Sequence, residues 1–192
     1  AFLAVAPAHA AIGEPTSPPA PSAVPTLVPA LGFEERMVAF GMTVAISGDQ
    51  AFVGEPRGGS AQLLDAGGAA PGLVHHYRRG PNGWRHVGRI FAADSAKSDG
   101  FGAAIAVDDR SLLIARLGFN DDADSTRGSV NTFRKRADGT WEHTGVVRAP
   151  AQVVRAAFGA ALLLAGDVAY VGAPTEGAGA VHLLRRNANG SW

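Results

Sequence analysis

The stretch FGAALLLAGDVAYVGAP, residues 158–174, decides the fold of this chain, because its pattern occurs three times. Residues 40–56 read FGMTVAISGDQAFVGEP, and the more divergent residues 101–117 read FGAAIAVDDRSLLIARL. Each copy opens on Phe-Gly, continues as an alternating apolar run, turns at a short polar pair and ends in a second apolar run. Alternation with a period of two is typical of β-strands, and its recurrence along the chain predicts a series of small sheets.

Two further strands follow in each unit. A Gly-led alternating segment recurs at residues 72–79, 128–135 and 179–186. The polar turns after it hold Asn82-Gly83, Asp138-Gly139 and Asn189-Gly190, and each turn is followed by a Trp. These dipeptides favour hairpins because they accept positive φ at low cost. A fourth run leaves the Trp at residues 84–90 and 141–147.

The sequence therefore predicts an all-β chain, a partial β-propeller of about three four-stranded antiparallel blades that start near residues 40, 101 and 158. No helix longer than two turns is expected in 40–192. Leu27-Val28 is expected to fill the fourth-strand position ahead of the first unit. Three blades do not close a ring, so we expect further blades or self-association to cover the open ends.

These motifs resemble the FG-GAP repeat family, whose best-known members are the amino-terminal propellers of integrin alpha chains. The residues of the motif are Phe40, Gly41, Gly54, Pro56, Phe101, Gly102, Phe158, Gly159, Gly172 and Pro174. The middle unit departs from the pattern, because Ala115-Arg116-Leu117 stands where Gly-Ala-Pro would be. The resemblance covers residues 27–192, fits the bacterial form of the repeat, and implies a propeller used for binding or adhesion. The calcium loop of the integrin repeats is missing from all three units, so the family's calcium sites do not carry over.

Composition excludes several classes of function. Lys plus Arg and Asp plus Glu both total 17, so the chain has no net charge that would attract nucleic acid. The chain has no cysteine, which removes disulfides, thiolate metal sites and cysteine nucleophiles. No segment is apolar for long enough to span a membrane.

The amino terminus favours export. Residues 1–10 end in Ala8-His9-Ala10, a small-x-small pattern typical of signal-peptide cleavage, and are interpreted as the remnant of a signal peptide. An ordinary Ala-rich terminus is the alternative. Residues 11–26 are rich in Pro and predict an extended linker. We therefore expect a periplasmic, cell-surface or extracellular protein.

One loop carries the only metal hypothesis. Asn120, Asp122 and Asp124, with Asp121 among them, supply the oxygen ligands that Ca²⁺ prefers. The loop lacks a Gly at the sharp turn and a Glu to close the site, so a solvated loop with Asx turns is the favoured alternative. No other cofactor is predicted.

The histidines are interpreted as structural. His75 and His182 share one position in the repeat, and His86 and His143 share another, as expected of residues that serve each sheet. No motif pairs a Ser or Asp with a His, and no His-Glu-x-x-His is present. The chain is therefore not expected to be an enzyme. The three Trp, at 84, 141 and 192, are expected to pack against the sheets.

Basic residues end the third strand of each unit, as Arg78-Arg79, Arg134-Lys135-Arg136 and Arg185-Arg186. They are expected at the face of the short turns, where they would hold an anionic glycan or phosphate, or pair with Asp49, Asp109 and Asp167 nearby. Pairing is the favoured interpretation. The longer loops lie at the opposite face, which we predict binds the ligand.

The favoured function is an exported binding or adhesion scaffold with a protein or glycan ligand on the long-loop face. The alternatives are the propeller segment of a secreted enzyme and a structural segment beside a separate functional domain.

Overall fold

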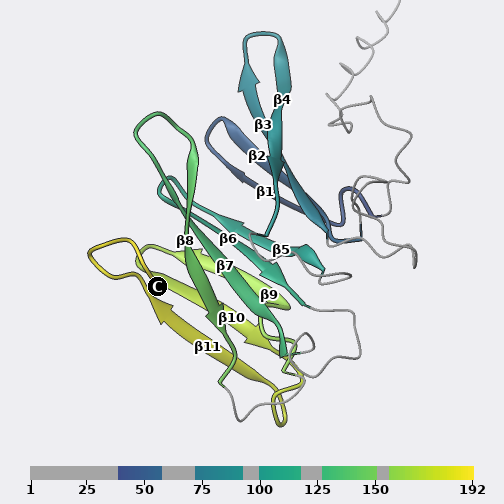
Figure 1. Ribbon diagram of the computed structural model, residues 1–192, viewed down its shortest axis with the longest axis vertical. Coiled ribbons are helices and arrows are strands. Elements are labelled where there is room, and N and C mark those ends of the chain that lie inside the picture. Colours follow the sequence, from purple (N-terminus) through teal and green to yellow (C-terminus); the bar gives the residue numbers. More distant parts are fainter. Residues whose placement is uncertain (1–38, 58–71, 93–99, 118–126, 151–155) are drawn as a thin grey trace, which may run out of the picture.

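The computed structural model describes residues 39–57, 72–92, 100–117, 127–150 and 156–192, which form three separate antiparallel sheets (Figure 1). Sheet 1 has the order β1 (Thr43–Ser47), β2 (Gln50–Glu55), β3 (Leu73–Gly80) and β4 (Gly83–Ile90). Sheet 2 has the order β5 (Phe101–Val107), β6 (Ser111–Arg116), β7 (Ser129–Lys135) and β8 (Trp141–Arg148). Sheet 3 consists of β9 (Ala161–Ala165), β10 (Val168–Ala173) and β11 (Ala180–Arg185), with β10 in the centre.

The all-β prediction is confirmed for the described residues, whose regular elements include no helix. None of these residues forms a helix long and apolar enough to cross a membrane. The sheets begin close to the three Phe-Gly pairs, but they do not show the closed ring of a propeller, so the propeller stays a prediction. Residues 1–10, residues 11–26 and Leu27-Val28 lie outside the described residues.

The first hairpin of each unit turns in one of two ways. Gly48 and Gly166 have φ of 59° and 63°, in the left-handed region that glycine adopts most easily. The middle unit has no glycine here. Asp109 stands in its place, and the preceding Asp108 accepts hydrogen bonds at Oδ1 from the backbone N–H of Arg110 (2.8 Å) and Ser111 (2.5 Å). An Asx turn thus closes the hairpin whose sequence matched the motif least.

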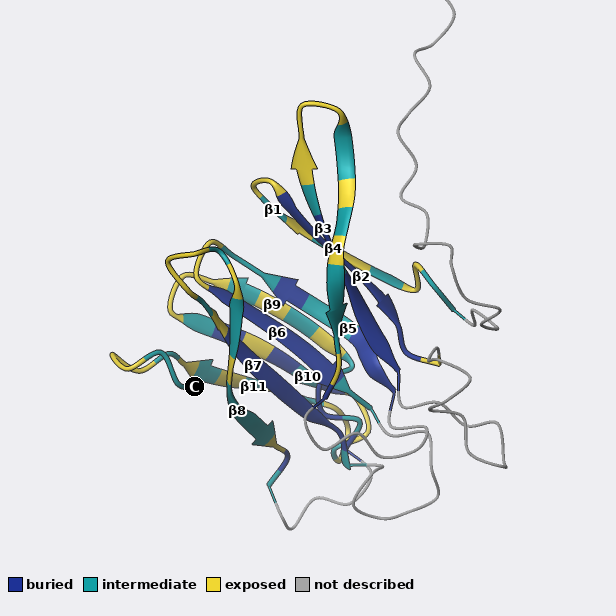
Figure 2. Cartoon of the chain, turned by 45° about the horizontal axis from the view of Figure 1, so that its top comes forward, coloured by how far each residue is buried: buried dark blue, intermediate teal, exposed yellow. Residues whose placement is uncertain are grey.

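The core lies between successive sheets. Phe101 is fully buried in a cluster with Phe52 and Val74 of sheet 1 and Ile114 of sheet 2. Phe158 is buried in the equivalent cluster between sheets 2 and 3. In Figure 2, dark blue marks the strands enclosed by these contacts, and yellow marks the exposed positions along sheet 3. Two of the three Phe of the Phe-Gly pairs are therefore buried between successive sheets.

Phe40 differs from its two counterparts, because it is only half-buried. Its ring packs edge-on against the His75 ring, with centroids 5.1 Å apart, inside its own unit. Phe101 and Phe158 each have a preceding sheet to pack against, whereas no described sheet precedes Phe40. The position in the series, rather than the motif, determines its exposure.

Glycines allow the sheets to approach closely. A Cβ on Gly72 would lie 2.5 Å from the Phe101 carbonyl oxygen, and one on Gly128 would lie 2.3 Å from that of Phe158. Such distances are too short for any side chain, so glycine is required at the start of β3 and β7. The Gly that leads the third strand is therefore part of the joint between one unit and the next Phe-Gly.

Candidate functional site

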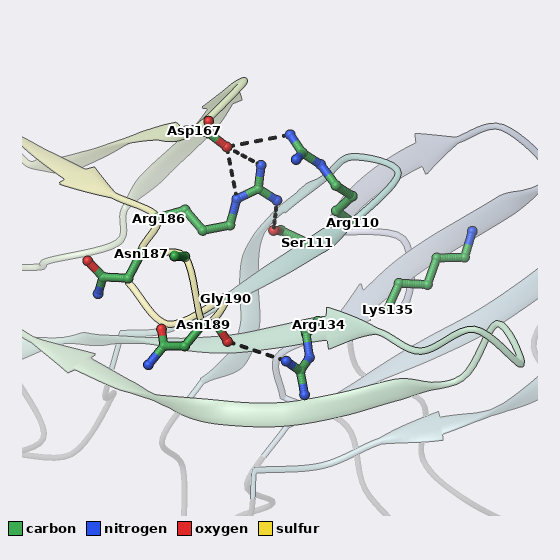
Figure 3. Close-up of a pocket in the computed structure, with 10 residues that line it drawn as sticks. Arg110, Ser111, Arg134, Lys135, Asp167, Arg186, Asn187, Asn189 and Gly190 are labelled. Atoms are coloured by element: carbon green, nitrogen blue, oxygen red, sulfur yellow. Dashed lines mark hydrogen bonds and ion pairs between the residues drawn. The ribbon is translucent and has the colours of Figure 1, made fainter.

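A cavity of about 550 Å³ lies at the short-turn end, between sheets 2 and 3 (Figure 3). Its lining residues come from the first hairpin turns, the ends of the third strands and the turn after β11. They are Arg110, Ser111, Arg134, Lys135, Asp167, Arg186, Asn187, Ala188, Asn189 and Gly190. Sequence reasoning placed the basic residues at this end but expected the ligand at the opposite one.

Backbone hydrogen bonds fix the basic residues at the rim. The N–H of Arg186, just after β11, donates to the Asp167 carbonyl (2.9 Å), and the N–H of Lys135 donates to the Arg110 carbonyl (2.9 Å). The same bond joins Arg79 to the Asp49 carbonyl in sheet 1 (2.7 Å). The end of each third strand is thus held against the turn of the first hairpin.

Asp167 is the only carboxylate among the lining residues, and it pairs with two guanidinium groups. Arg186 donates to Asp167 Oδ1 from Nε (3.1 Å) and from Nη2, and Arg110 Nη2 lies 3.5 Å from the same oxygen. Hydrogen bonds and charge from Arg186, and to a lesser extent the charge of Arg110, lower the pKa of Asp167. Arg186 Nη1 also donates to Ser111 Oγ across the two sheets (3.0 Å).

Arg134 joins sheet 2 to the last turn. Its Nη1 donates to the Asn189 carbonyl (3.3 Å), and its Nη2 donates to Glu142 Oε2 (2.7 Å). Arg136 donates to the other oxygen of Glu142 (3.1 Å). Hydrogen bonds from Arg136 and then Arg134 lower the pKa of Glu142 to about 2, so this carboxylate stays ionised at neutral pH.

The cavity lining is cationic. Four lining residues are Arg or Lys and one is Asp, which leaves a net charge of +3 (4 − 1). Arg110 is 59% exposed and makes only long contacts, with oxygens 3.5 Å and 3.7 Å away. Lys135 extends away from Asp167 in Figure 3, and no described carboxylate pairs with its ammonium group. These two cations are the groups best placed to meet an incoming anion.

The lining provides no activated nucleophile. Ser111 is the one hydroxyl in the lining, and its Oγ contacts a guanidinium rather than a His or a carboxylate. Among the described residues, no group of three His, Cys, Asp or Glu side chains could hold a metal ion. The geometry therefore suits binding of an anionic group rather than acid–base chemistry.

The predicted pairing of the basic residues is present at several points. Arg186 contacts Asp167, and Arg78 Nε lies 3.8 Å from Asp49 Oδ2. Sequence reasoning did not identify Glu142 as a partner, because its position opposite Arg134 follows from the register of β7 and β8.

The predicted calcium ligands, Asn120, Asp122 and Asp124, lie outside the described residues, as do most of the long loops. The histidines that are described make internal contacts. His75 Nε2 lies 2.8 Å from Glu55 Oε2, with both side chains buried, and His182 Nε2 lies 2.5 Å from Glu176 Oε2.

His76 lies at the joint between sheets 1 and 2. It stacks on Phe52 with ring centroids 4.7 Å apart, and its Nε2 lies 2.8 Å from Gln50 Oε1, which also accepts from Trp141 Nε1 (2.9 Å). Burial, followed by the charge of Arg78, lowers the pKa of His76 to about 4. Trp84, Trp141 and Trp192 are partly buried and each packs against one apolar cluster, in line with the packing role expected of them.

A scan against protein-family models finds no family that matches this chain, and no curated protein is significantly similar to it. The resemblance to FG-GAP repeats therefore depends on the repeated residues alone.

Proposed function

We propose that this chain is a segment of an FG-GAP-type β-propeller that acts as an exported binding scaffold, with an anionic ligand held between sheets 2 and 3. The observation that carries the proposal is the cationic cavity, in which Arg110 contacts carboxylate oxygens at 3.5 Å and 3.7 Å and Lys135 pairs with no carboxylate of the described residues. The three Phe-Gly units, joined in series by buried Phe and close glycine contacts, support the propeller assignment.

The ligand chemistry follows from the lining. Guanidinium and ammonium groups bind sulfate, phosphate and carboxylate through charge-assisted hydrogen bonds. Amide and hydroxyl groups of Asn187, Asn189 and Ser111 lie beside them and suit neutral hydroxyls of the same ligand. A volume of about 550 Å³ is in the range of small-molecule sites. An acidic glycan, with one charged sugar in the cavity, fits this combination best.

The proposal is tested with a sulfated tetrasaccharide and its desulfated counterpart, titrated calorimetrically into the full chain. We expect only the sulfated sugar to bind, with an affinity that falls as salt rises. Arg110→Ala and Lys135→Ala should each weaken binding by about tenfold or more, because a hydrogen bond to a charged group contributes roughly 1.5–3 kcal/mol.

Arg85→Ala is the matched control, since Arg85 is exposed on β4 and does not line the cavity. Equal binding of both sugars, or an equal loss in all three variants, would refute an anion site at this position.

A further inference from the structure

Successive sheets are joined by a repeated seat. The Phe101-Gly102 backbone rests on sheet 1, where a Cβ on Gly54 would lie 2.3 Å from the Gly102 carbonyl oxygen. Gly72, at the start of the third strand, lies just as close to Phe101. We call this arrangement the Phe-Gly seat. It consists of the Gly or Ala near the end of the second strand, the Gly before the third strand, and the Val two residues after that second Gly.

The second seat repeats the first. Phe158-Gly159 rests on sheet 2, where a Cβ on Gly159 would lie 3.0 Å from Ala115 Cβ and 3.3 Å from Val130 Cγ2. Ala115 occupies the position of Gly54, and Val130 occupies that of Val74. Both valines are completely buried under the next sheet. Two independent joints in one chain therefore share the same construction.

Sheet 3 carries a third seat that is empty. Gly172 and Gly179 occupy the positions of Gly54 and Gly72, and with Ala161, Pro174 and Val181 they border an apolar hollow of about 420 Å³. Val181, the counterpart of the two buried valines, is 63% exposed. Leu163 and Leu183 continue the same face, at 59% and 60% exposure. This face has the composition of a sheet interior, and no other described segment covers it.

The complementary surface is open on sheet 1. Met42, Val44 and Ile46 of the β1 segment are 58%, 55% and 56% exposed, whereas Ile105 and Leu162, the counterparts of Val44, pack against the preceding sheet. Gly41 has φ of 83°, close to the 94° of Gly102 and the 99° of Gly159. Apart from its two chain neighbours, no described residue has an atom within 4 Å of the place where its Cβ would be. Phe40-Gly41 therefore has the conformation that packs into a Phe-Gly seat, but no described sheet precedes it to provide one.

We infer that the empty seat on sheet 3 binds the Phe40-Gly41 end of sheet 1 of a second copy of this chain. The contact is head-to-tail, because each copy offers the seat at one end and its occupant at the other. Such heterologous contacts build rings or open chains rather than symmetric pairs. The inference is independent of the anionic ligand proposed above.

An arginine forms a hydrogen bond across each joint, and the equivalent arginine of sheet 3 is exposed. Arg78 Nη2 donates to the Gly139 carbonyl of sheet 2 (3.3 Å), and Arg134 Nη1 donates to the Asn189 carbonyl of the unit of sheet 3 (3.3 Å). Arg185 occupies the same position, is exposed, and makes no such bond to the described part of the chain. In the head-to-tail contact it would donate to the turn at Asn82-Gly83 of the second copy.

Sedimentation velocity of the full chain over a wide concentration range tests the inference. We expect association that Leu183→Asp and Val44→Asp each weaken at least about tenfold, because each places a charge in an apolar interface. Both residues are exposed, and circular dichroism checks that the variants keep their sheets. Val87→Asp, at a third exposed apolar position on β4, should leave association unchanged.

Mixing separates the head-to-tail contact from other modes. Leu183→Asp protein keeps an intact sheet 1, and Val44→Asp protein keeps an intact seat, so the mixture should form a dimer of one copy of each and nothing larger. A symmetric contact would not be restored by mixing. A chain that stays monomeric at every concentration, or association that persists in both variants, would overturn the inference.

Discussion

Phe158→Ala offers the sharpest test of the inter-sheet core, because Phe40 supplies an internal comparison. Both residues open the same motif, yet Phe158 is 1% exposed in the cluster between sheets 2 and 3, whereas Phe40 is half-buried against Ala51 and Tyr77 of its own sheet. Removing a fully buried Phe ring typically costs about 3–5 kcal/mol, because burial is lost and a cavity remains. The partly exposed ring of Phe40 should cost about 1–2 kcal/mol.

Urea unfolding followed by circular dichroism measures both free energies. For a chain of this size, roughly 2–4 °C per kcal/mol converts the loss for Phe158→Ala into a fall in Tm of roughly 6–20 °C. The measurements are made at low protein concentration, so that association does not cover Phe40. Equal losses in the two variants, or an unchanged Tm for Phe158→Ala, would show that the joints between sheets do not hold the fold together.

Three further predictions concern single positions. Gly128→Ala should destabilise far more than Gly83→Ala in urea unfolding, because both have positive φ but only Gly128 would place its Cβ against a backbone carbonyl, 2.3 Å away. Stability should fall as the pH drops from about 6.5 to about 4, because His76 has a folded pKa near 4 and the unfolded chain takes up the proton first. His76→Gln should reduce the pH dependence of the free energy of unfolding between about pH 6.5 and pH 4. An unchanged pH dependence would exclude His76 as its source. Asn131→Leu should stabilise the chain by about 1–3 kcal/mol, since its buried side-chain N and O have no hydrogen-bond partner among the described residues. His75→Leu should instead destabilise the chain by leaving a buried glutamate unpaired.

The strands and turns could be predicted because their signals are local. Alternation fixed the strand positions, and the Gly-Asp and Asn-Gly pairs marked the hairpins, as the four-strand order of sheets 1 and 2 confirms. The exposure of Phe40 could not be predicted from the motif, because it depends on whether a sheet precedes the unit. The role of Gly72 and Gly128 was also hidden, since the contact each glycine makes is with a residue of the next unit.

The candidate site was predicted only in part. The recurring basic pairs placed positive charge at the short-turn end, and Asp167 was recognised as a neighbour of Arg186. The cavity itself depends on how sheets 2 and 3 are placed relative to each other at the short-turn end, and no local sequence pattern encodes that placement. Gln50, which joins His76 to Trp141 across two sheets, carries no sequence signal at all, because nothing in its own strand distinguishes it from a solvated Gln.

Comparing equivalent residues of the three units distinguishes residues that pack between sheets from residues that line the candidate site. The Phe of Phe-Gly and the Gly before the third strand recur in all three units, and at the two described joints they hold successive sheets together. The second residue of the first hairpin turn differs in charge between units: it is Asp49 in sheet 1, Arg110 in sheet 2 and Asp167 in sheet 3. That exchange of acid for base at Arg110 supplies one of the four cations that line the cavity. A departure from the repeat at a packed position would weaken a joint, whereas this one lies on an exposed turn and changes only the surface charge. Arg110 is therefore a residue at which binding can be altered with little effect on the fold. A loss of affinity in the Arg110→Ala titration would then report a lost contact with the ligand rather than a disrupted sheet.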